Sequence, residues 1–259
     1  MNIVVCVKQV PDTYSERTLR ADDSTLDRDA ADALINELDE YAIEEGLRLA
    51  EEHGGEVTIF SMGPEKASES IRKALSMGAD KAVHLTDAGL HGSDALTTSA
   101  AMAKVLGQTE FDLVILGSES TDARMGVLAA MLAERLGVPQ LSYASKVEID
   151  GSSITINRLA DYGYDTVTGS LPAVVSVVEK INEPRYPSFK GIMAAKKKPV
   201  ETLSLADIGL DPGEVGLAAS ATEVVSFAKR PARAAGTIVA DEGDGGTQAA
   251  EFLAAQKFI

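Results

Sequence analysis

Three loops of the sequence carry the residue types that bind anionic nucleotides. They are "CVKQVPDT", "FSMGP" and "LGSESTDARMG", and each follows an apolar run and offers small residues or glycine near an expected helix start. Free backbone N–H groups and the helix dipole favour an anion at such a place. Lys8 or Arg124 adds positive charge, and Asn36 lies near the start of the first long helix, within reach of the same crevice. The other interpretation is that these loops are ordinary turns and helix caps.

The sequence contains no recognisable set of catalytic residues. It has neither a GxSxG motif nor a Walker loop, and no GxGxxG follows a strand. His53, His84 and His91 lack the spacing of metal ligands, and Cys6 is the single cysteine, so no disulfide forms within the chain. We therefore expect no catalytic residues and no metal site.

The order of apolar and polar residues is typical of an α/β protein. β-Branched runs suited to buried strands alternate with amphipathic segments of helical spacing. Residues 8–12 are expected as a loop and residues 18–27 as a hairpin. This order predicts a doubly wound, mostly parallel sheet, Rossmann-like and of the adenine nucleotide-binding type. The strands are expected at 3–7, 56–63, 81–85 and 111–117, and the helices at 32–52, 64–78, 93–106 and 122–136.

The alternation of strands and helices changes after Pro139. Residues 146–158 surround an Asp-Gly pair, which indicates an added antiparallel hairpin. Residues 165–180 add one or two strands, the last of them buried. From Pro199 the chain loses strong periodicity, which favours an extended C-terminal arm, with a short helix at 246–256.

Two regions are expected on this basis. Residues 1–198 form the α/β nucleotide-binding domain, and residues 199–259 form the C-terminal extension. An arm with too little apolar surface to fold alone has to lie on its own domain or on a partner.

Composition and charge exclude several classes of protein. The chain has 259 residues and a formal net charge of −16, which makes duplex nucleic acid a poor partner. No stretch approaches the roughly 20 apolar residues of a membrane helix, so no direct membrane insertion is expected. The N-terminus "MNIVVCVKQV" is interpreted as a first strand and not as a signal peptide. A cytoplasmic location fits these features and the single cysteine.

A proline-stiffened loop with two aromatic residues follows the last apolar run. In "INEPRYPSFKGIMAAKKK", from Ile181 to Lys198, two prolines flank Tyr186, and Phe189 precedes a short helix-like segment that ends in three lysines. The pattern favours an exposed surface for a partner. The alternative is that both aromatic side chains pack within their own subunit.

Four stretches together resemble one known family. They are "VKQVPDT", "NELDEYAIEEGLRLAEE", "SMGPEKASESIRKALSMGADKAVHL" and "LPAVVSVVEKINEPRYPSFKGIMAAKKKP". The chain resembles the β subunit of electron-transfer flavoproteins, collinearly from Met1 to about Lys198 and more weakly beyond.

The resemblance implies a function in electron transfer rather than an enzyme. The family works as a heterodimer in which the α subunit holds FAD and the β subunit binds AMP structurally. Electrons arrive from acyl-CoA dehydrogenases of fatty-acid β-oxidation and related enzymes, and leave to a membrane quinone oxidoreductase or another acceptor. The C-terminal extension is expected to pack on the α subunit.

The resemblance also implies which residues hold the nucleotide. Val127, Leu128 and Ala129 stand where the family often has Gln-Thr-Gly or Gln-Val-Gly, so Gly126 and Arg124 are expected to replace the lost phosphate contacts. The cofactor-binding candidates are Cys6, Lys8, Asn36, Glu37, Leu38, Asp39, Met62, Gly63, Gly117, Asp122, Ala123, Arg124, Met125, Gly126, Val127 and Leu128.

The loop at residues 177–198 corresponds to the family's partner-recognition loop. Phe189 occupies the anchor position, where the family often has leucine, and Tyr186, Ile192 and Met193 are the further candidates for partner binding. The lysines at 196–198 either meet acidic partners or cap a helix C-terminus.

Two alternatives remain open at this stage. One is a bifurcating β subunit that carries a second FAD, reduced by NADH, in place of AMP. The other is a stand-alone α/β domain that binds or hydrolyses nucleotides without an α subunit.

Overall fold

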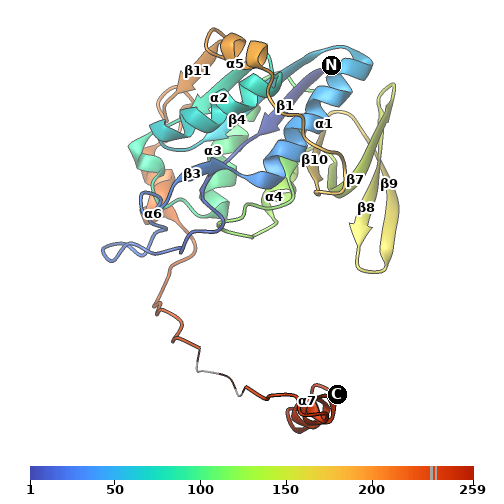
Figure 1. Cartoon of the computed structure of the whole chain (residues 1–259). Coiled ribbons are helices and arrows are strands. Elements are labelled where there is room, and N and C mark those ends of the chain that lie inside the picture. The colour runs from blue at the N-terminus through green and yellow to red at the C-terminus, as the bar shows by residue number, and fades with distance from the viewer. Residues whose placement is uncertain (234–235, 237) are drawn as a thin grey trace. The chain divides into compact units, whose positions relative to one another are not determined.

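Nine strands form one sheet in the computed structural model, which describes residues 1–233, 236 and 238–259 (Figure 1). The strand order is β11-β5-β4-β1-β6-β10-β7-β8-β9. Neighbours pair in parallel from β11 to β7, and β7, β8 and β9 pair antiparallel. The strands are β1 (Asn2–Cys6), β4 (Glu56–Met62), β5 (Lys81–Leu85), β6 (Leu113–Gly117), β7 (Gln140–Asp150), β8 (Ser153–Ala160), β9 (Gly163–Ser170), β10 (Ala173–Val177) and β11 (Val200–Leu203).

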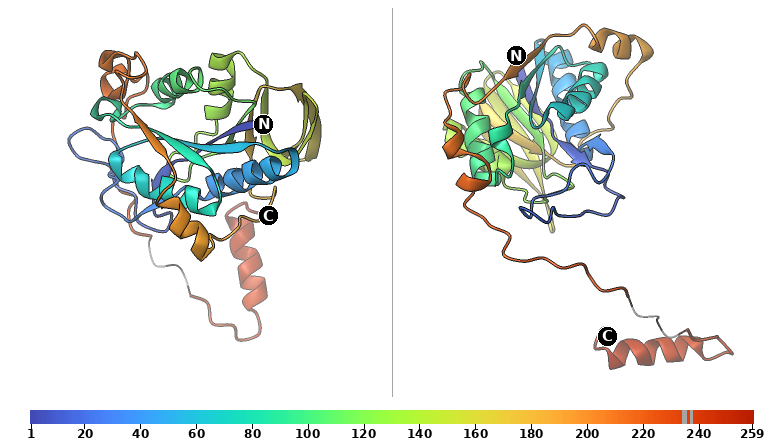
Figure 2. Two further views of the ribbon diagram at one scale, coloured as in Figure 1. Left: turned by 90° about the horizontal axis from the view of Figure 1, so that it is seen from above. Right: turned by 90° about the vertical axis from the view of Figure 1, so that its left-hand side faces the viewer.

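Helices cover both faces of this sheet, which confirms the predicted doubly wound fold (Figure 2). Alternate side chains of each central strand face opposite sides, so that Val5 and Val175 pack with α1, and Val4 and Val174 pack with α3. On the first face lie α1 (Glu37–His53), α2 (Ser68–Met77) and α5 (Phe189–Ala195), and on the second lie α3 (Ala95–Leu106), α4 (Leu128–Leu136) and α6 (Gly216–Ala219).

The first predicted helix begins five residues too early. Residues 33–35 form the short strand β3 (Ala33–Ile35), which pairs antiparallel with β2 (Gln9–Pro11), so the expected loop at 8–12 also contains a strand. Tertiary pairing of two segments far apart in the chain overrides the local helical pattern there. The hairpin expected at 18–27 contains one antiparallel bridge, between Leu19 and Leu26.

The helix predicted at 122–136 begins only at Leu128. Arg124 has a φ of 50° and Gly126 a φ of 64°, and these left-handed conformations cannot continue a right-handed helix. The segment before Leu128 is therefore an irregular loop. The N-cap of α3 is Asp94, whose carboxylate accepts from the Thr97 N–H at 2.9 Å.

The boundary expected after residue 198 differs from the structure. β11 extends the main sheet beside β5, and Leu205, Ile208 and Leu210 are buried against the second helical face. The chain divides into one unit at Met1–Glu223 and a second at Val224–Ile259, which contains α7 (Gly245–Ala255). A strand of four residues is too short to show a clear periodicity, so β11 could not be predicted from the sequence.

Candidate functional site

The candidate site lies at the point where the strand order reverses. Chain order runs outward from β1 through β4 and β5 on one side, and through β6 and β10 on the other. In open α/β sheets the loops after the two strands at such a switch point separate and leave a crevice for a ligand. Lys8 follows β1 and residues 118–127 follow β6, so two of the three loops singled out in the sequence meet here.

Asn36 and Asp39 join these loops to the start of α1. One Asp39 carboxylate oxygen accepts from the Lys8 N–H at 2.8 Å, and the other accepts from the Asn36 amide at 2.9 Å. The Gly117 N–H also reaches Asp39, at 3.3 Å. Asn36 in turn accepts from the Thr121 N–H at 3.0 Å and donates to a backbone carbonyl of the same loop. The strand ends are thus fixed by side chains from one helix start.

Burial raises the pKa of Asp39 to about 7, although the hydrogen bonds from Asn36, Lys8 and Gly117 favour the charged carboxylate. Burial also raises the pKa of the Cys6 thiol, and the Asp39 charge adds to this effect. Cys6 therefore stays a neutral thiol beside the site, which suits packing and not nucleophilic chemistry.

A change of Asp39 to Asn should alter the pH dependence of stability. The folded pKa of about 7 lies above the ordinary value of 3.8, so between these values the folded chain binds more protons than the unfolded chain. The contribution of Asp39 is therefore fully present below its ordinary pKa and is lost as pH rises, by up to roughly 1.4 kcal/mol per pH unit. Urea unfolding across this window checks the slope, and equal slopes for the wild type and Asp39→Asn would contradict the raised pKa.

Asp122 lies between two cations. Its carboxylate, which is 1% exposed, contacts the Lys8 ammonium at 2.7 Å and the Arg28 guanidinium at 3.0 Å. Burial opposes ionisation of Asp122, but the charges of Lys8 and Arg28 outweigh it and hold its pKa below the ordinary value. Burial lowers the pKa of Lys8, and the Asp122 charge opposes this. The ion pair ties the loop after β1 to the loop after β6.

Two buried hydroxyl groups near these strand ends have no hydrogen-bond partner among residues 1–233, 236 and 238–259. They belong to Ser61, close to the end of β4, and to Thr121, in the loop after β6. A buried hydroxyl without a partner costs free energy, so each is suited to a polar ligand or an ordered water.

The start of α4 also suits an anion. Val127 occupies its N-cap and gives no side-chain hydrogen bond, so no side chain caps the first N–H groups. The first turn of α1, in contrast, carries Glu37, Asp39 and Glu40, which repel an anion. A phosphate at this site is therefore better placed at α4 than at α1.

The structure does not bring all predicted cofactor residues together. Cys6, Lys8, Asn36, Asp39, Gly117 and Asp122 converge at the switch point. Met62 ends β4 nearby and Gly63 follows it, where the His84 ring contacts the Gly63 carbonyl at 3.1 Å. Glu37, Ala123, Arg124 and Met125 are exposed, and Leu38, Gly126, Val127 and Leu128 are half-buried. Arg28 was not predicted, whereas Ser61 and Thr121 lie in two of the predicted loops but were not named individually.

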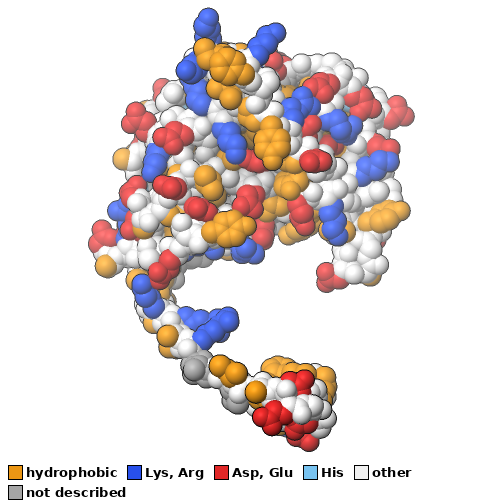
Figure 3. Space-filling model, viewed as in Figure 1, with side chains coloured by type: hydrophobic (Ala, Val, Ile, Leu, Met, Phe, Trp, Pro, Cys, Tyr) orange, Lys and Arg blue, Asp and Glu red, His pale blue; other side chains and the backbone are white. Residues whose placement is uncertain are grey.

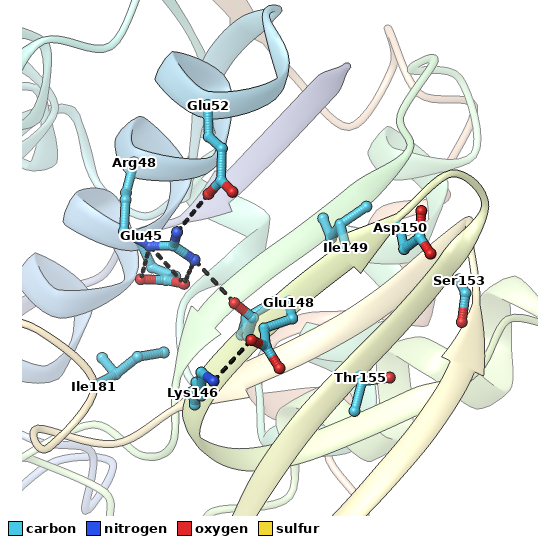
Figure 4. A pocket seen from close by; sticks show the side chains of 11 residues that line it. Glu45, Arg48, Glu52, Lys146, Glu148, Ile149, Asp150, Ser153, Thr155 and Ile181 are labelled. Carbon is cyan, nitrogen blue, oxygen red and sulfur yellow. Dashed lines mark hydrogen bonds and ion pairs between the residues drawn. The ribbon is translucent and has the colours of Figure 1, made fainter.

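Two open pockets lie outside the switch point. One, of about 560 Å³, separates α1 from the β7–β8 hairpin, and most of its charged side chains pair among themselves (Figure 4). Arg48 contacts Glu45 at 2.6 Å and Glu52 at 2.7 Å. The other, of about 510 Å³, is lined by residues such as Tyr143 and Lys180. The first pocket thus presents paired charges and no clear demand for a ligand.

A second candidate site is an exposed apolar surface on α5. Phe189, Ile192 and Met193 have the i, i+3, i+4 spacing of one helical face and are 81%, 45% and 49% exposed. Tyr186, just before the helix, is 95% exposed. We call these four residues the docking face. In Figure 3 hydrophobic side chains at α5 have Lys and Arg side chains on either side.

The three lysines after α5 have different environments. Lys196 and Lys197 are exposed, whereas the Lys198 ammonium donates to the carbonyls of Leu75 and Gly78, each at 3.0 Å, at the C-terminus of α2. Lys198 therefore caps a neighbouring helix, while the other two leave positive charge beside the docking face.

Two further observations on the described residues concern metal ions and membranes. Among residues 1–233, 236 and 238–259, no group of three or more His, Cys, Asp or Glu side chains is placed to hold a metal ion. Within the same residues, no helix combines the length and the apolarity that a membrane crossing requires.

The fold and the switch-point site define a doubly wound α/β protein of the class that binds ligands at strand ends. A model of the electron transfer flavoprotein domain matches residues 23–208. Electron transfer flavoprotein β subunits of Mycobacterium tuberculosis (strain H37Rv) and Mycobacterium leprae are 55% and 54% identical over 264 residues, covering 100% of this chain and 99% of each relative. A subunit of the caffeyl-CoA reductase-Etf complex of Acetobacterium woodii is 35% identical over 92% of each chain. The chain belongs to the electron transfer flavoprotein family and is of its β-subunit type.

Proposed function

We propose that this chain is the β subunit of a heterodimeric electron-transfer flavoprotein that carries electrons and catalyses no covalent reaction alone. It pairs with an α subunit, which holds most of the FAD, and works in the cytoplasm between acyl-CoA dehydrogenases and a membrane quinone oxidoreductase or another acceptor. The observation that carries the proposal is the docking face. An apolar surface with exposed lysines beside it, on a chain of net charge −16, favours a specific partner over a general surface role.

We infer that the switch-point site holds AMP. The buried hydroxyls of Ser61 and Thr121 need polar partners, and the uncapped start of α4 suits the phosphate. Gly117 lets the start of α1 approach the end of β6 at the edge of the site, because a Cβ there would lie 2.7 Å from an Asp39 carboxylate oxygen. AMP supplies no redox chemistry and joins the loops around the site.

The second unit supports a role for the α subunit. None of the residues of α7 is buried, and Phe252 and Phe258 are 60% and 73% exposed. Exposed aromatic side chains at this density favour burial against another chain. This also argues against the stand-alone nucleotide-hydrolysing domain.

Removal of residues 224–259 should weaken the complex with the α subunit. The truncated chain keeps the sheet and both helical layers, so its own thermal unfolding should change little. We expect the dissociation constant for the α subunit to rise at least about tenfold, since the lost segment offers large apolar side chains. Analytical ultracentrifugation of mixed subunits measures it, and undiminished association would show that the arm does not hold the α subunit.

The second candidate is a bifurcating β subunit with FAD in place of AMP. One relative is a subunit of a caffeyl-CoA reductase-Etf complex, so an assembly other than a simple heterodimer is also considered. The ion pairs of Asp122 with Lys8 and Arg28 lie at the strand ends with either nucleotide. Counting the released nucleotides separates the two candidates.

A further inference from the structure

The segment that carries the docking face has little apolar anchorage of its own. α5 is seven residues long, too short to be stable alone, and Ala195 is its buried residue. Its orientation must therefore come from contacts to other elements, and the structure provides polar contacts at both ends.

At the N-terminal end of the segment, Arg185 binds two carboxylates of α1. Its Nε and Nη2 donate to the two oxygens of Glu44 at 2.8 and 2.9 Å, and its backbone N–H donates to the same side chain at 3.1 Å. Its Nη1 donates to Glu51 at 2.6 Å. Glu44 and Glu51 lie seven residues apart, on one face of α1, so the planar guanidinium spans two helical turns.

Charge supports this arrangement. The hydrogen bonds to Glu44 and, to a smaller extent, to Glu51 raise the pKa of Arg185, and the hydrogen bond from Arg185 lowers the pKa of Glu51. The Glu44 side chain is 13% exposed and that of Arg185 is 35% exposed, so water only partly screens the pair.

At the C-terminal end, α5 rests on α2. Arg72 of α2 donates to the carbonyls of Ala195 and Lys198 at 2.7 and 3.0 Å, and Lys198 returns hydrogen bonds to the end of α2. Gly191 allows this close approach, since a Cβ there would lie 2.4 Å from the Ser76 carbonyl oxygen. The C-terminal end is thus fixed independently of Arg185.

We propose that Arg185 is a positioning residue. Its guanidinium, bound to the Glu44 and Glu51 carboxylates, holds Tyr186 and Phe189 in their docking orientation before a partner binds. This inference rests on the proposed function and deepens it. Arg185 directly precedes Tyr186, and Pro187 restricts the backbone that follows. The hydrogen bonds of Arg185 therefore restrain Phe189 through a short and stiff stretch of chain. Order that exists before binding lowers the entropy lost on binding.

The test compares Arg185→Ala and Arg185→Lys in the purified heterodimer with a matched arginine elsewhere. Arg135 serves as control, because it ties α4 to Ser99 and Leu96 of α3 on the other face of the sheet. Hydrogen exchange followed by mass spectrometry reports on residues 186–197. Steady-state transfer from an acyl-CoA dehydrogenase reduced by its acyl-CoA reports KM for the flavoprotein and kcat.

For Arg185→Ala we expect amide exchange in 186–197 to quicken about tenfold or more. We expect KM to rise about tenfold with kcat within about twofold of wild type. Arg185→Lys should fall between, because an ammonium cannot engage both carboxylates in the same way. Arg135→Ala should change neither quantity.

Unchanged exchange in 186–197, or faster exchange with an unchanged KM, overturns the inference. A Phe189→Ala variant in the same assay separates it from the proposed function. If Phe189→Ala slows transfer and Arg185→Ala does not, the positioning inference alone is wrong. If Phe189→Ala has no effect, docking through this face is wrong, and with it the positioning inference.

Discussion

A change of Phe189 to Ala should slow electron transfer from an acyl-CoA dehydrogenase about thirtyfold or more at low flavoprotein concentration, as expected for an anchor worth at least about 2 kcal/mol. Phe189 is 81% exposed and is held at the start of α5 by the Ser188 cap, so its side chain is available before binding. Stopped-flow reduction of the heterodimer measures the rate. The flavin content should stay that of the wild type, because the change removes no contact at the switch point.

Leu96→Ala is the matched control for this variant. Leu96 is also an apolar helix residue, is 47% exposed, and lies on α3, across the sheet from α5. We expect wild-type transfer kinetics for Leu96→Ala. Wild-type kinetics for Phe189→Ala with each dehydrogenase tested would contradict the docking role.

A change of Gly117 to Ala should strip the heterodimer of most of its AMP. The added Cβ would lie 2.7 Å from an Asp39 oxygen and 2.8 Å from the Leu38 Cβ, so the start of α1 has to shift. Overpacking of this kind costs about 1–3 kcal/mol, and this cost weakens nucleotide binding roughly 5- to 150-fold if it falls on the bound state. Chromatography of the nucleotides released on denaturation measures the loss.

Gly246→Ala provides the matched substitution. Gly246 lies in α7, and a Cβ there meets no heavy atom within 4 Å. AMP content should match the wild type in this variant. Full AMP content in Gly117→Ala would show that the nucleotide does not depend on the junction of β6 with α1.

Much of the fold could be predicted because its local patterns agree with its tertiary structure. The buried runs that became β1, β4, β5 and β6 are apolar on both faces, as parallel strands require. The start of α4 could not be predicted, because the left-handed conformation of Arg124 carries no sequence signal. β11 was missed because its pairing with β5 depends on residues far away in the chain.

The candidate site could be predicted in part for a similar reason. Lys8 follows β1 and Gly117 ends β6, and the carboxyl ends of these strands share one edge, so the sheet topology brings the two residues together. Arg28 lies in a loop with no periodicity, and its contact with Asp122 spans 94 positions of sequence. The contact of Arg185 with Glu44 spans 141 positions and could not be predicted from the sequence either.

The nucleotide content of the purified heterodimer tests most directly whether the switch-point site holds AMP. Denaturation followed by chromatography counts the FAD and AMP released per heterodimer. We expect equal amounts of the two, with AMP reduced in Gly117→Ala and FAD unchanged. Two equivalents of FAD without AMP would contradict the assignment of the switch-point site and identify the chain as a subunit with its own flavin.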